Sequence, residues 1–215
     1  MIECIVAGEK LVMLREKALY WPRESTLFVA DFHLGKASAF RSAGIPMPSG
    51  TTTDNVTRLA SAIASTGAKR VVFLGDFLHA KASKARSTEE TFGAWRASHS
   101  AVDLVLVRGN HDTSAGDPRE DWDIECVDEG AVLGPFIANH HPEAKRGGYV
   151  LAGHIHPAVR LSGDGDSVRL PCFWFSSRVG VLPAFGAFTG SAVVRPREGD
   201  QVFVIADGEV ISVGT

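Results

Sequence analysis

The sequence predicts an α/β fold in which two packed β-sheets are flanked by helices. Strands alternate with helices in the first part of the chain, whereas the later part contains mainly hairpins. The length of 215 residues suits one domain with a substantial core and is short for two. No internal repeat, low-complexity tract or linker divides the chain. We therefore expect a single domain that covers residues 1–215.

Apolar runs bounded by turn residues place the elements of the first part. The expected strands are residues 3–7, 11–14, 18–21, 26–30, 71–74 and 102–107. The expected helices, identified by apolar residues at helical spacing, are residues 36–43, 51–66 and 87–98. The last of these helices opens with Ser87 and Glu90 at the spacing of a capping box.

The second part of the chain is predicted to be rich in β-structure. The expected strands are residues 124–127, 134–138, 149–152, 167–175, 178–182, 191–195, 202–206 and 209–213. The last two form a hairpin whose turn contains Asp207 and Gly208. The acidic segment 114–130 is expected to be a solvated loop apart from its short strand.

Composition limits the compartment and the partners of the protein. The net charge of -3 excludes recognition of nucleic acid through a general positive field, so any such binding must be local. The three cysteines lie far apart and form no CxxC motif, as expected for reduced thiols. No basic segment followed by an apolar one begins the sequence, and no apolar stretch approaches the roughly 20 residues of a membrane span. We therefore expect a cytoplasmic protein without a membrane segment.

Five apolar runs end in side chains that could bind a metal ion. These side chains are Asp31, His33, Asp76, Asn110, His140, His154 and His156. Functional groups gather at the carboxyl ends of strands in α/β sheets, so we expect these residues to converge. Asp31 and His33 are two residues apart and would point the same way from an extended backbone, and His154 and His156 repeat that spacing.

Oxygen and nitrogen ligands without cysteine argue against a structural zinc site and for a catalytic centre. Seven ligands are too many for one transition metal and suit two ions about 3.5–4 Å apart that share a carboxylate. Asp76 is the expected bridge because it follows a glycine and has no ligating residue two positions away. Manganese fits this ligand mixture best, and iron, zinc and cobalt are the alternatives.

These motifs, in this order, resemble the calcineurin-like metallophosphoesterase superfamily. The blocks of that superfamily correspond here to Asp31-Phe32-His33, Gly75–His79, Gly109–Asp112, His140 and Gly153–His156. The segments Leu170–Phe175 and Leu182–Gly190 are similar to the C-terminal signature of the ligase-associated DNA damage response endonucleases, the PdeM group. The resemblance implies a four-layer αββα sandwich of two mixed sheets flanked by helices.

The fourth block departs from the pattern of the superfamily. Its lone histidine usually precedes glycine, whereas here His140 precedes His141. We assign the metal to His140 because this residue directly follows the expected strand, with His141 as the alternative.

The resemblance implies a role for each ligand. One metal ion would be held by Asp31, His33 and His156, and a second by Asn110, His140 and His154, with Asp76 between them. Two such ions lower the pKa of a shared water, and the resulting hydroxide would attack phosphorus. We assign His111 to protonating the leaving group or stabilising the transition state. Asp112 would orient His111, and an exposed turn residue is the alternative.

The substrate is less well defined than the reaction. His79 is the last residue of the second block and could contact the substrate or support the metal ligands, the alternative being a packed histidine. Lys81, Lys84 and Arg86 follow the block and could contact a phosphate backbone, the alternative being solvated cations. DNA as substrate during repair, with a DNA ligase-like protein and a helicase as partners, is implied mainly by the resemblance. The competing functions are a small-molecule phosphodiesterase or phosphomonoesterase and a noncatalytic interaction scaffold. A scaffold is disfavoured because every ligand position and His111 are present.

Overall fold

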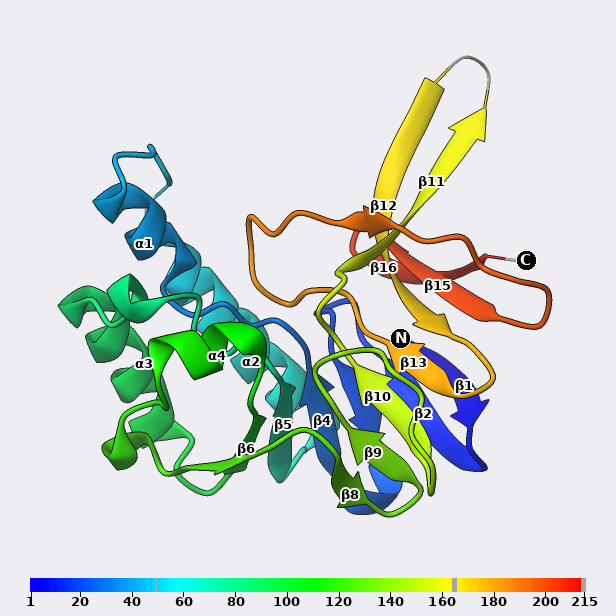
Figure 1. Ribbon diagram of the computed structural model, residues 1–215, viewed down its shortest axis with the longest axis horizontal. Coiled ribbons are helices and arrows are strands. Elements are labelled where there is room, and N and C mark those ends of the chain that lie inside the picture. The colour runs from blue at the N-terminus through cyan, green and yellow to red at the C-terminus, as the bar shows by residue number, and fades with distance from the viewer. Residues whose placement is uncertain (49, 164–165, 214–215) are drawn as a thin grey trace.

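The computed structural model describes residues 1–48, 50–163 and 166–213, and its strands form two mixed sheets (Figure 1). The first sheet contains, in spatial order, β1 (Ile2–Val6), β2 (Glu9–Met13), β3 (Leu19–Trp21), β4 (Thr26–Val29), β5 (Arg70–Leu74), β6 (Asp103–Val107) and β7 (Ile124–Val127). Strands β1 to β4 pair antiparallel, and β4 to β7 pair parallel. The carboxyl ends of β4, β5 and β6 therefore lie at one edge of this sheet.

The second sheet is formed by the later part of the chain. Its strands are, in spatial order, β14 (Ala192–Val193), β11 (Pro157–Gly163), β12 (Asp166–Phe175), β13 (Val179–Val181), β10 (Tyr149–Ala152), β9 (Phe136–Ala138) and β8 (Ala131–Leu133). In addition, β15 (Gln201–Ala206) pairs with β12, and β16 (Glu209–Val213) pairs with β15. Strand β10 runs parallel to both β9 and β13, which confirms a second mixed sheet.

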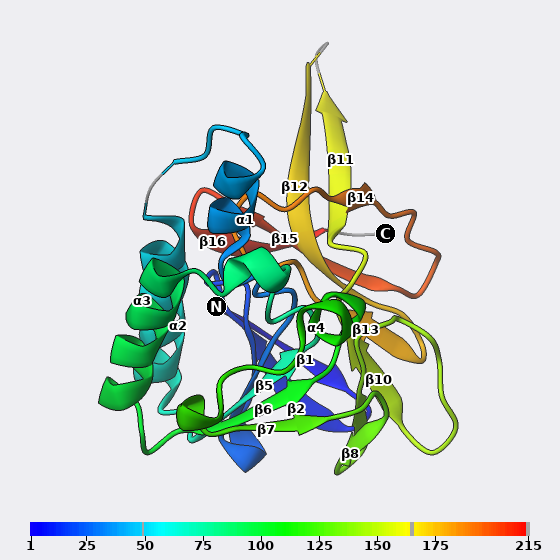
Figure 2. The same ribbon diagram turned by 60° about the vertical axis from the view of Figure 1, so that its left-hand side comes forward.

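The helices connect strands of the first sheet and lie on its side of the molecule (Figures 1 and 2). They are α1 (Lys36–Ser42), α2 (Thr51–Thr66), α3 (Arg86–Ser98) and α4 (Asn110–Ala115), with short 3-10 turns η1 (Pro22–Glu24), η2 (Lys81–Ser83) and η3 (Glu120–Trp122). Within the described ranges, none of these helices is long and apolar enough to span a membrane.

The predicted α/β fold with two mixed sheets and flanking helices is confirmed, with one difference in its layers. Over the described residues no α-helix follows Ala115, so the outer face of the second sheet has no layer of α-helices. The physical reason lies in the connections, because the antiparallel pairs β8–β9, β11–β12, β12–β13 and β15–β16 are joined by hairpins or short loops that have no room for a helix.

The largest local differences from the sequence prediction concern short elements. Helix α3 begins at Arg86 with Ala85 as its N-cap and no side-chain cap, so Ser87 lies inside the first turn and forms no capping box. Strands β8 and β11 and helix α4 were not predicted. Helix α4 has six residues, which is too few to produce a recognisable helical period.

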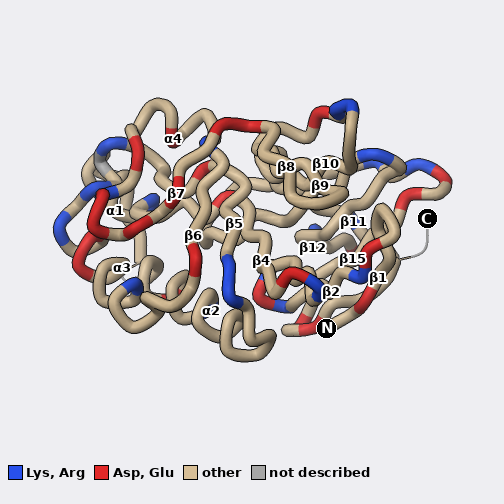
Figure 3. The backbone as a smooth tube through the Cα atoms, turned by 90° about the horizontal axis from the view of Figure 1, so that it is seen from below, with Lys and Arg blue, Asp and Glu red and all other residues tan. Residues whose placement is uncertain are grey.

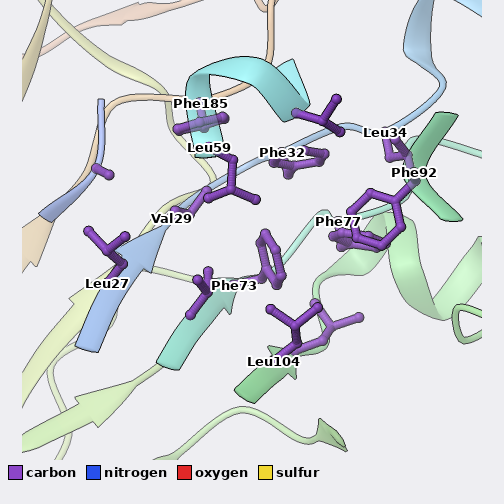
Figure 4. Packing of buried hydrophobic residues seen from close by; sticks show 14 of the residues in the cluster. Leu27, Val29, Phe32, Leu34, Leu59, Phe73, Phe77, Phe92, Leu104 and Phe185 are labelled. Carbon is purple, nitrogen blue, oxygen red and sulfur yellow. The ribbon is translucent and has the colours of Figure 1, made fainter. Parts of the chain in front are cut away.

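The core between the first sheet and the helices supports the loops that carry the predicted ligands (Figure 4). Phe32 is fully buried and lies between Phe77 and Phe185, with ring centroids 5.5 Å away on each side and interplanar angles of 16° and 15°. Stacked rings at this separation add to the stabilisation from buried area. Since Phe32 lies between Asp31 and His33 in sequence, its packing fixes the backbone from which both ligands project.

We expect Phe32→Ala to lower the free energy of unfolding by about 3–5 kcal/mol, the usual cost of removing a buried aromatic ring. The cavity would lie directly beneath the first motif, so metal affinity should fall together with stability. Denaturant unfolding of the metal-free protein measures the first effect, and Phe188→Ala, at a side chain that is 54% exposed, is the matched control. Unchanged stability of Phe32→Ala would contradict the anchoring role.

Candidate metal centre

The predicted ligands lie where five strands end. Asp31 and His33 follow β4, Asp76 follows β5, and Asn110 opens α4 after β6. From the second sheet, His140 follows β9, and His154 and His156 follow β10. Isolated bridges from Ala30 to Ala184 and from Leu34 to Leu78 connect the loops around this region. The edges of the two packed sheets therefore meet at the predicted centre.

The backbone at the ligands differs from the extended geometry expected from their two-residue spacing. The left-handed region is occupied by five of them, with φ values of 53° at Asp31, 49° at His33, 52° at Asp76, 70° at His154 and 50° at His156. Residues other than glycine rarely adopt this conformation, and it concentrates at functional sites. The ligands converge because the chain curls at each strand end, and not because an extended strand presents alternate side chains.

The first group of donor atoms consists of Asp31, His33 and His156, whose potential ligand atoms all lie within 4.8 Å of one another. His156 Nδ1 donates to the Gly190 carbonyl at 2.9 Å, which leaves Nε2 facing Asp31 Oδ1 at 3.4 Å. Both ring nitrogens of His33 are buried without a hydrogen-bond partner. Burial, followed by nearby positive groups such as Lys36, lowers the pKa of His33 well below its ordinary value. A neutral imidazole with a free lone pair is the form that binds metal.

The second group consists of His140, His141 and His154, again within 4.8 Å of one another. His140 is fully buried, and its Nδ1 donates to the Leu74 carbonyl at 3.1 Å. Its Nε2 lies 3.0 Å from Asn110 Oδ1 and 3.0 Å from His154 Nδ1. Burial lowers the pKa of His140, against the raising effect of Asp31, and so favours a neutral ring.

Two carboxylates join these groups. Asp31, Asp76 and His140 also offer donor atoms within 4.8 Å of one another, with His140 Nε2 3.4 Å from Asp76 Oδ1. A neutral His140 that donates through Nδ1 therefore presents an Nε2 lone pair to acceptor oxygens, an arrangement that cations would satisfy. With the unpartnered nitrogens of His33, this donor set fits the two predicted divalent ions.

Glycines precede several ligands because there is no room for a side chain. A Cβ at Gly75, where φ is 78°, would overlap the ring of His140. A Cβ at Gly153 would lie 2.5 Å from Asp31 Oδ2. The Gly-Asp and Gly-His motifs therefore allow ligands from different strands to pack against the preceding backbone.

His111 lies beside the donor groups as predicted. Its Nδ1 donates to the His79 carbonyl at 2.7 Å, and its Nε2 lies 3.8 Å from Asp76 Oδ2. The side chain is 38% exposed, so the ring reaches the surface of the molecule. The backbone N–H of His111 donates to Asp76 Oδ1 at 3.0 Å. His111 therefore supports a predicted ligand through its backbone N–H, and its ring lies beside the donor groups.

The prediction that Asp112 orients His111 is wrong. Asp112 is buried, and its carboxylate accepts hydrogen bonds from three backbone N–H groups, Leu78 at 2.8 Å, Gly109 at 2.9 Å and Phe77 at 3.3 Å. The ring of His111 is oriented instead by the His79 carbonyl. Asp112 holds the second and third motif loops together as a positioning residue, and its burial rules out the alternative of an exposed turn residue.

The predicted substrate residues divide into two sets. His79 lies at the centre, stacked on His111 with ring centroids 4.9 Å apart, and burial followed by Lys36 lowers its pKa to about 4. Lys81 is exposed at the start of η2. In contrast, Lys84 Nζ donates to the Asp117 carbonyl at 3.0 Å, and Arg86 Nε donates to Glu90 at 2.7 Å. Intramolecular partners therefore already engage Lys84 and Arg86.

Several contacts that orient the predicted site residues could not be predicted from the sequence. The carbonyls of Leu74, His79 and Gly190, which orient three histidines, leave no signal in residue identity. Lys36, in contrast, is a residue that the sequence does indicate, because it follows the first motif. Burial lowers the pKa of its ammonium, against the raising effect of Asp31 and Asp76.

Glu129 was also missed, because it falls in the segment expected to be a solvated loop. One of its oxygens accepts hydrogen bonds from the backbone N–H groups of His140 and His141, at 2.8 Å and 2.7 Å. The same oxygen lies 3.0 Å from His141 Nδ1. Glu129 therefore fixes the backbone of the fourth motif.

The geometry favours His140 over His141 as the ligand of the fourth motif. His140 is fully buried between Asn110, Asp76 and His154, whereas His141 is partly exposed and contacts Glu129. We expect His140→Ala to lose one of two bound ions and His141→Ala to retain both, as measured by elemental analysis of dialysed protein. Loss of an ion from His141→Ala alone would reverse the assignment.

Comparison with known proteins agrees with this geometry. The model of the calcineurin-like phosphoesterase family matches residues 25–156, which include all seven predicted ligands. The chain belongs to the calcineurin-like phosphoesterase family. The crystal structure of Pseudomonas putida nuclease MPE is similar over 99% of both chains, with 39% sequence identity and a TM-score of 0.88. As a calcineurin-like phosphoesterase, the chain is a hydrolase of phosphoesters.

A second solved structure, that of the phosphoesterase Yfce from E. coli, has 14% identity and a TM-score of 0.42. The similar region covers 87% of this chain and 97% of the other. None of the curated proteins matches the sequence. The likeness to the P. putida nuclease extends beyond the family motifs to the second sheet, where β12 contains Leu170–Phe175, and to the segment Leu182–Gly190 between β13 and β14.

Proposed function

We propose that this calcineurin-like phosphoesterase is a metal-dependent phosphodiesterase that cleaves DNA. The observation that carries the proposal is the convergence of two donor groups on the paired carboxylates of Asp31 and Asp76. The full-length similarity to a nuclease supports DNA as the substrate class. A role in DNA repair beside a DNA ligase-like protein and a helicase, and manganese as the metal, remain part of this proposal.

The residues of the centre would have three kinds of role: holding metal ions, positioning the motif loops and contacting the substrate. Asp31, His33 and His156 would hold one divalent ion, and Asn110, His140 and His154 a second, with Asp76 contacting both. Bound ions of this kind acidify water and offset the charge that builds up on the phosphate. The carboxylates of Asp112 and Glu129 hold the motif loops in place by accepting hydrogen bonds from backbone N–H groups of those loops. His111 presents Nε2 to the substrate while the His79 carbonyl holds Nδ1.

The test is a substrate panel with each of several divalent metals, manganese included. Metal-free protein would be supplied with single-stranded DNA, plasmid DNA, bis(p-nitrophenyl) phosphate and p-nitrophenyl phosphate. We expect cleavage of DNA and of the diester, both abolished by a chelator. Hydrolysis of only the small esters would favour a small-molecule phosphoesterase, and no turnover with any metal would favour a noncatalytic scaffold.

A further inference from the structure

The hairpin of β11 and β12 projects from the body of the molecule on the same side as α1 (Figures 1 and 2). Strand β11 begins at Pro157, directly after the predicted ligand His156. The hairpin is therefore attached to the metal centre by its first residue. It lies outside the donor groups and has no role in holding a metal.

The register of the hairpin gives it two different faces. Directly opposed residues of an antiparallel pair share a face, and successive pairs alternate between faces. Val159 opposes Leu170 and Leu161 opposes Val168, which makes one face apolar. The other face carries Arg160 opposite Arg169 and then Ser162 opposite Ser167. Toward its tip the second face is therefore polar and basic.

Arg160 and Arg169 are a pair of like charges on this face. Both are exposed, and like charges directly opposed across strands destabilise a sheet. In the part of the chain that the structure describes, neither guanidinium has a carboxylate partner, and Arg169 Nη1 makes a long contact of 3.4 Å with the Ser191 carbonyl. Folding gains nothing from this placement, whereas an anionic partner would compensate both charges.

The arginine face adjoins the metal centre. The Gly190 carbonyl accepts a hydrogen bond from His156 Nδ1, and the carbonyl of the next residue, Ser191, contacts Arg169. Arg160 is four positions after His156 along nearly extended chain, a span of about 13 Å. This distance is too long for contact with a phosphate at the metals. It suits a phosphate farther along the same nucleic-acid strand.

The charge distribution over the rest of the protein means that a polyanionic substrate must be held by local contacts. Lys and Arg occur around α1 and α3 and at the opposite end near β11 and β15, interspersed with Asp and Glu (Figure 3). With a net charge of -3, the protein has no general field that would retain a polyanion. Recognition of a long substrate therefore depends on small groups of cations placed beside the centre.

We propose that Arg160 and Arg169 bind the phosphate backbone of a DNA strand several nucleotides from the bond that is cleaved. This inference rests on the proposed function and adds the surface that selects a polynucleotide over a small diester. Guanidinium groups bind phosphate through paired hydrogen bonds, and contacts to the backbone carry no base preference. The hairpin acts as an arm that holds DNA in register with the metals.

The experiment compares wild type with R160Q/R169Q in the metal-loaded full-length protein. The substrates are a long single-stranded oligonucleotide, a dinucleotide and bis(p-nitrophenyl) phosphate. We expect kcat/KM on the oligonucleotide to fall about tenfold or more, mainly through KM, with a much smaller change on the other two. The dependence of oligonucleotide affinity on salt should become less steep by about 1.4 in logarithmic slope, which corresponds to two lost phosphate contacts on a single strand.

A charge-matched control is K69Q/R70Q, which removes two cations at the start of β5, the opposite end of this strand from Asp76. This variant should match wild type on all three substrates. Equal thermal unfolding midpoints would exclude a folding defect in R160Q/R169Q. If wild type cleaves DNA and R160Q/R169Q binds and cleaves it equally well, Arg160 and Arg169 do not bind the DNA backbone, while the proposed function stands. If wild type hydrolyses only the small esters, both proposals fail.

Discussion

We expect Asp76→Asn to lose both bound metal ions and to slow phosphodiester hydrolysis by more than about 10³-fold. The substitution keeps the shape of the side chain and removes only its negative charge. Asn tolerates the left-handed backbone found at this position, where φ is 52°. An amide oxygen can still accept the hydrogen bond that His111 N–H donates to Asp76 Oδ1. The loss would therefore report the charge between the two donor groups and not a collapse of the loop.

The stability of the metal-free variant tests the effect of the Asp76 charge independently of metal binding. Burial raises the pKa of the Asp76 carboxyl, against the lowering effect of the His111 N–H hydrogen bond. A carboxyl with a raised pKa in the folded state lowers the unfolding free energy above the unfolded-state pKa, because the unfolded chain loses that proton more readily. At neutral pH, metal-free Asp76→Asn should therefore unfold at the same temperature as wild type or at a higher one.

Added metal should reverse that order. Ions that bind the folded state raise the unfolding temperature of wild type by mass action, and the variant should show little of this shift. Elemental analysis and metal-dependent thermal shifts measure the effect, with Asp121→Asn as the control for an acidic residue on the surface, paired with Arg119. Two tightly bound ions in Asp76→Asn would exclude the bridging role of this carboxylate.

The positions of the predicted ligands could be inferred from sequence because strand ends carry their own signal. Apolar runs such as 71–74 and 149–152 are recognisable as buried strands, and the residue types that follow them are rare together. Parallel strands place their carboxyl ends at one edge, so the topology brings these strand ends together, although the side chains converge only because the backbone curls there. The ligand positions therefore required no knowledge of the backbone angles at the strand ends.

The details within the site depended on backbone geometry that residue identity does not encode. Because His33 and His156 adopt left-handed conformations, the spacing of the ligands in sequence does not determine the direction in which their side chains point. For the same reason, His154 and His156 do not act as a pair, and each joins a different donor group. The orienting role of Asp112 was misassigned because this residue is next to His111 only in sequence. Its carboxylate accepts hydrogen bonds from the backbone N–H groups of Phe77 and Leu78, which belong to another loop.

We expect His111→Ala to keep both metal ions and to lose about 10²–10⁴-fold in the rate of DNA cleavage, the range typical of a lost general acid or base. The metals should remain because the contact of His111 with Asp76 that matters for binding comes from the backbone N–H, which alanine retains. The rate should fall because the ring nitrogen Nε2 is removed. A variant that retains both metal ions but loses turnover would distinguish His111 from the metal ligands, whose removal should reduce metal binding.

The leaving group distinguishes the two roles assigned to His111. If the ring protonates the leaving oxygen, the variant should lose far less activity on bis(p-nitrophenyl) phosphate, because p-nitrophenolate leaves without a proton. If it stabilises charge on the phosphate instead, the loss should be similar on both substrates. His99→Ala is the matched control, since His99 lies outside the centre and stacks on Trp95. Full activity of His111→Ala on DNA would remove this residue from the mechanism and leave the neighbouring His79 ring as the next histidine to test.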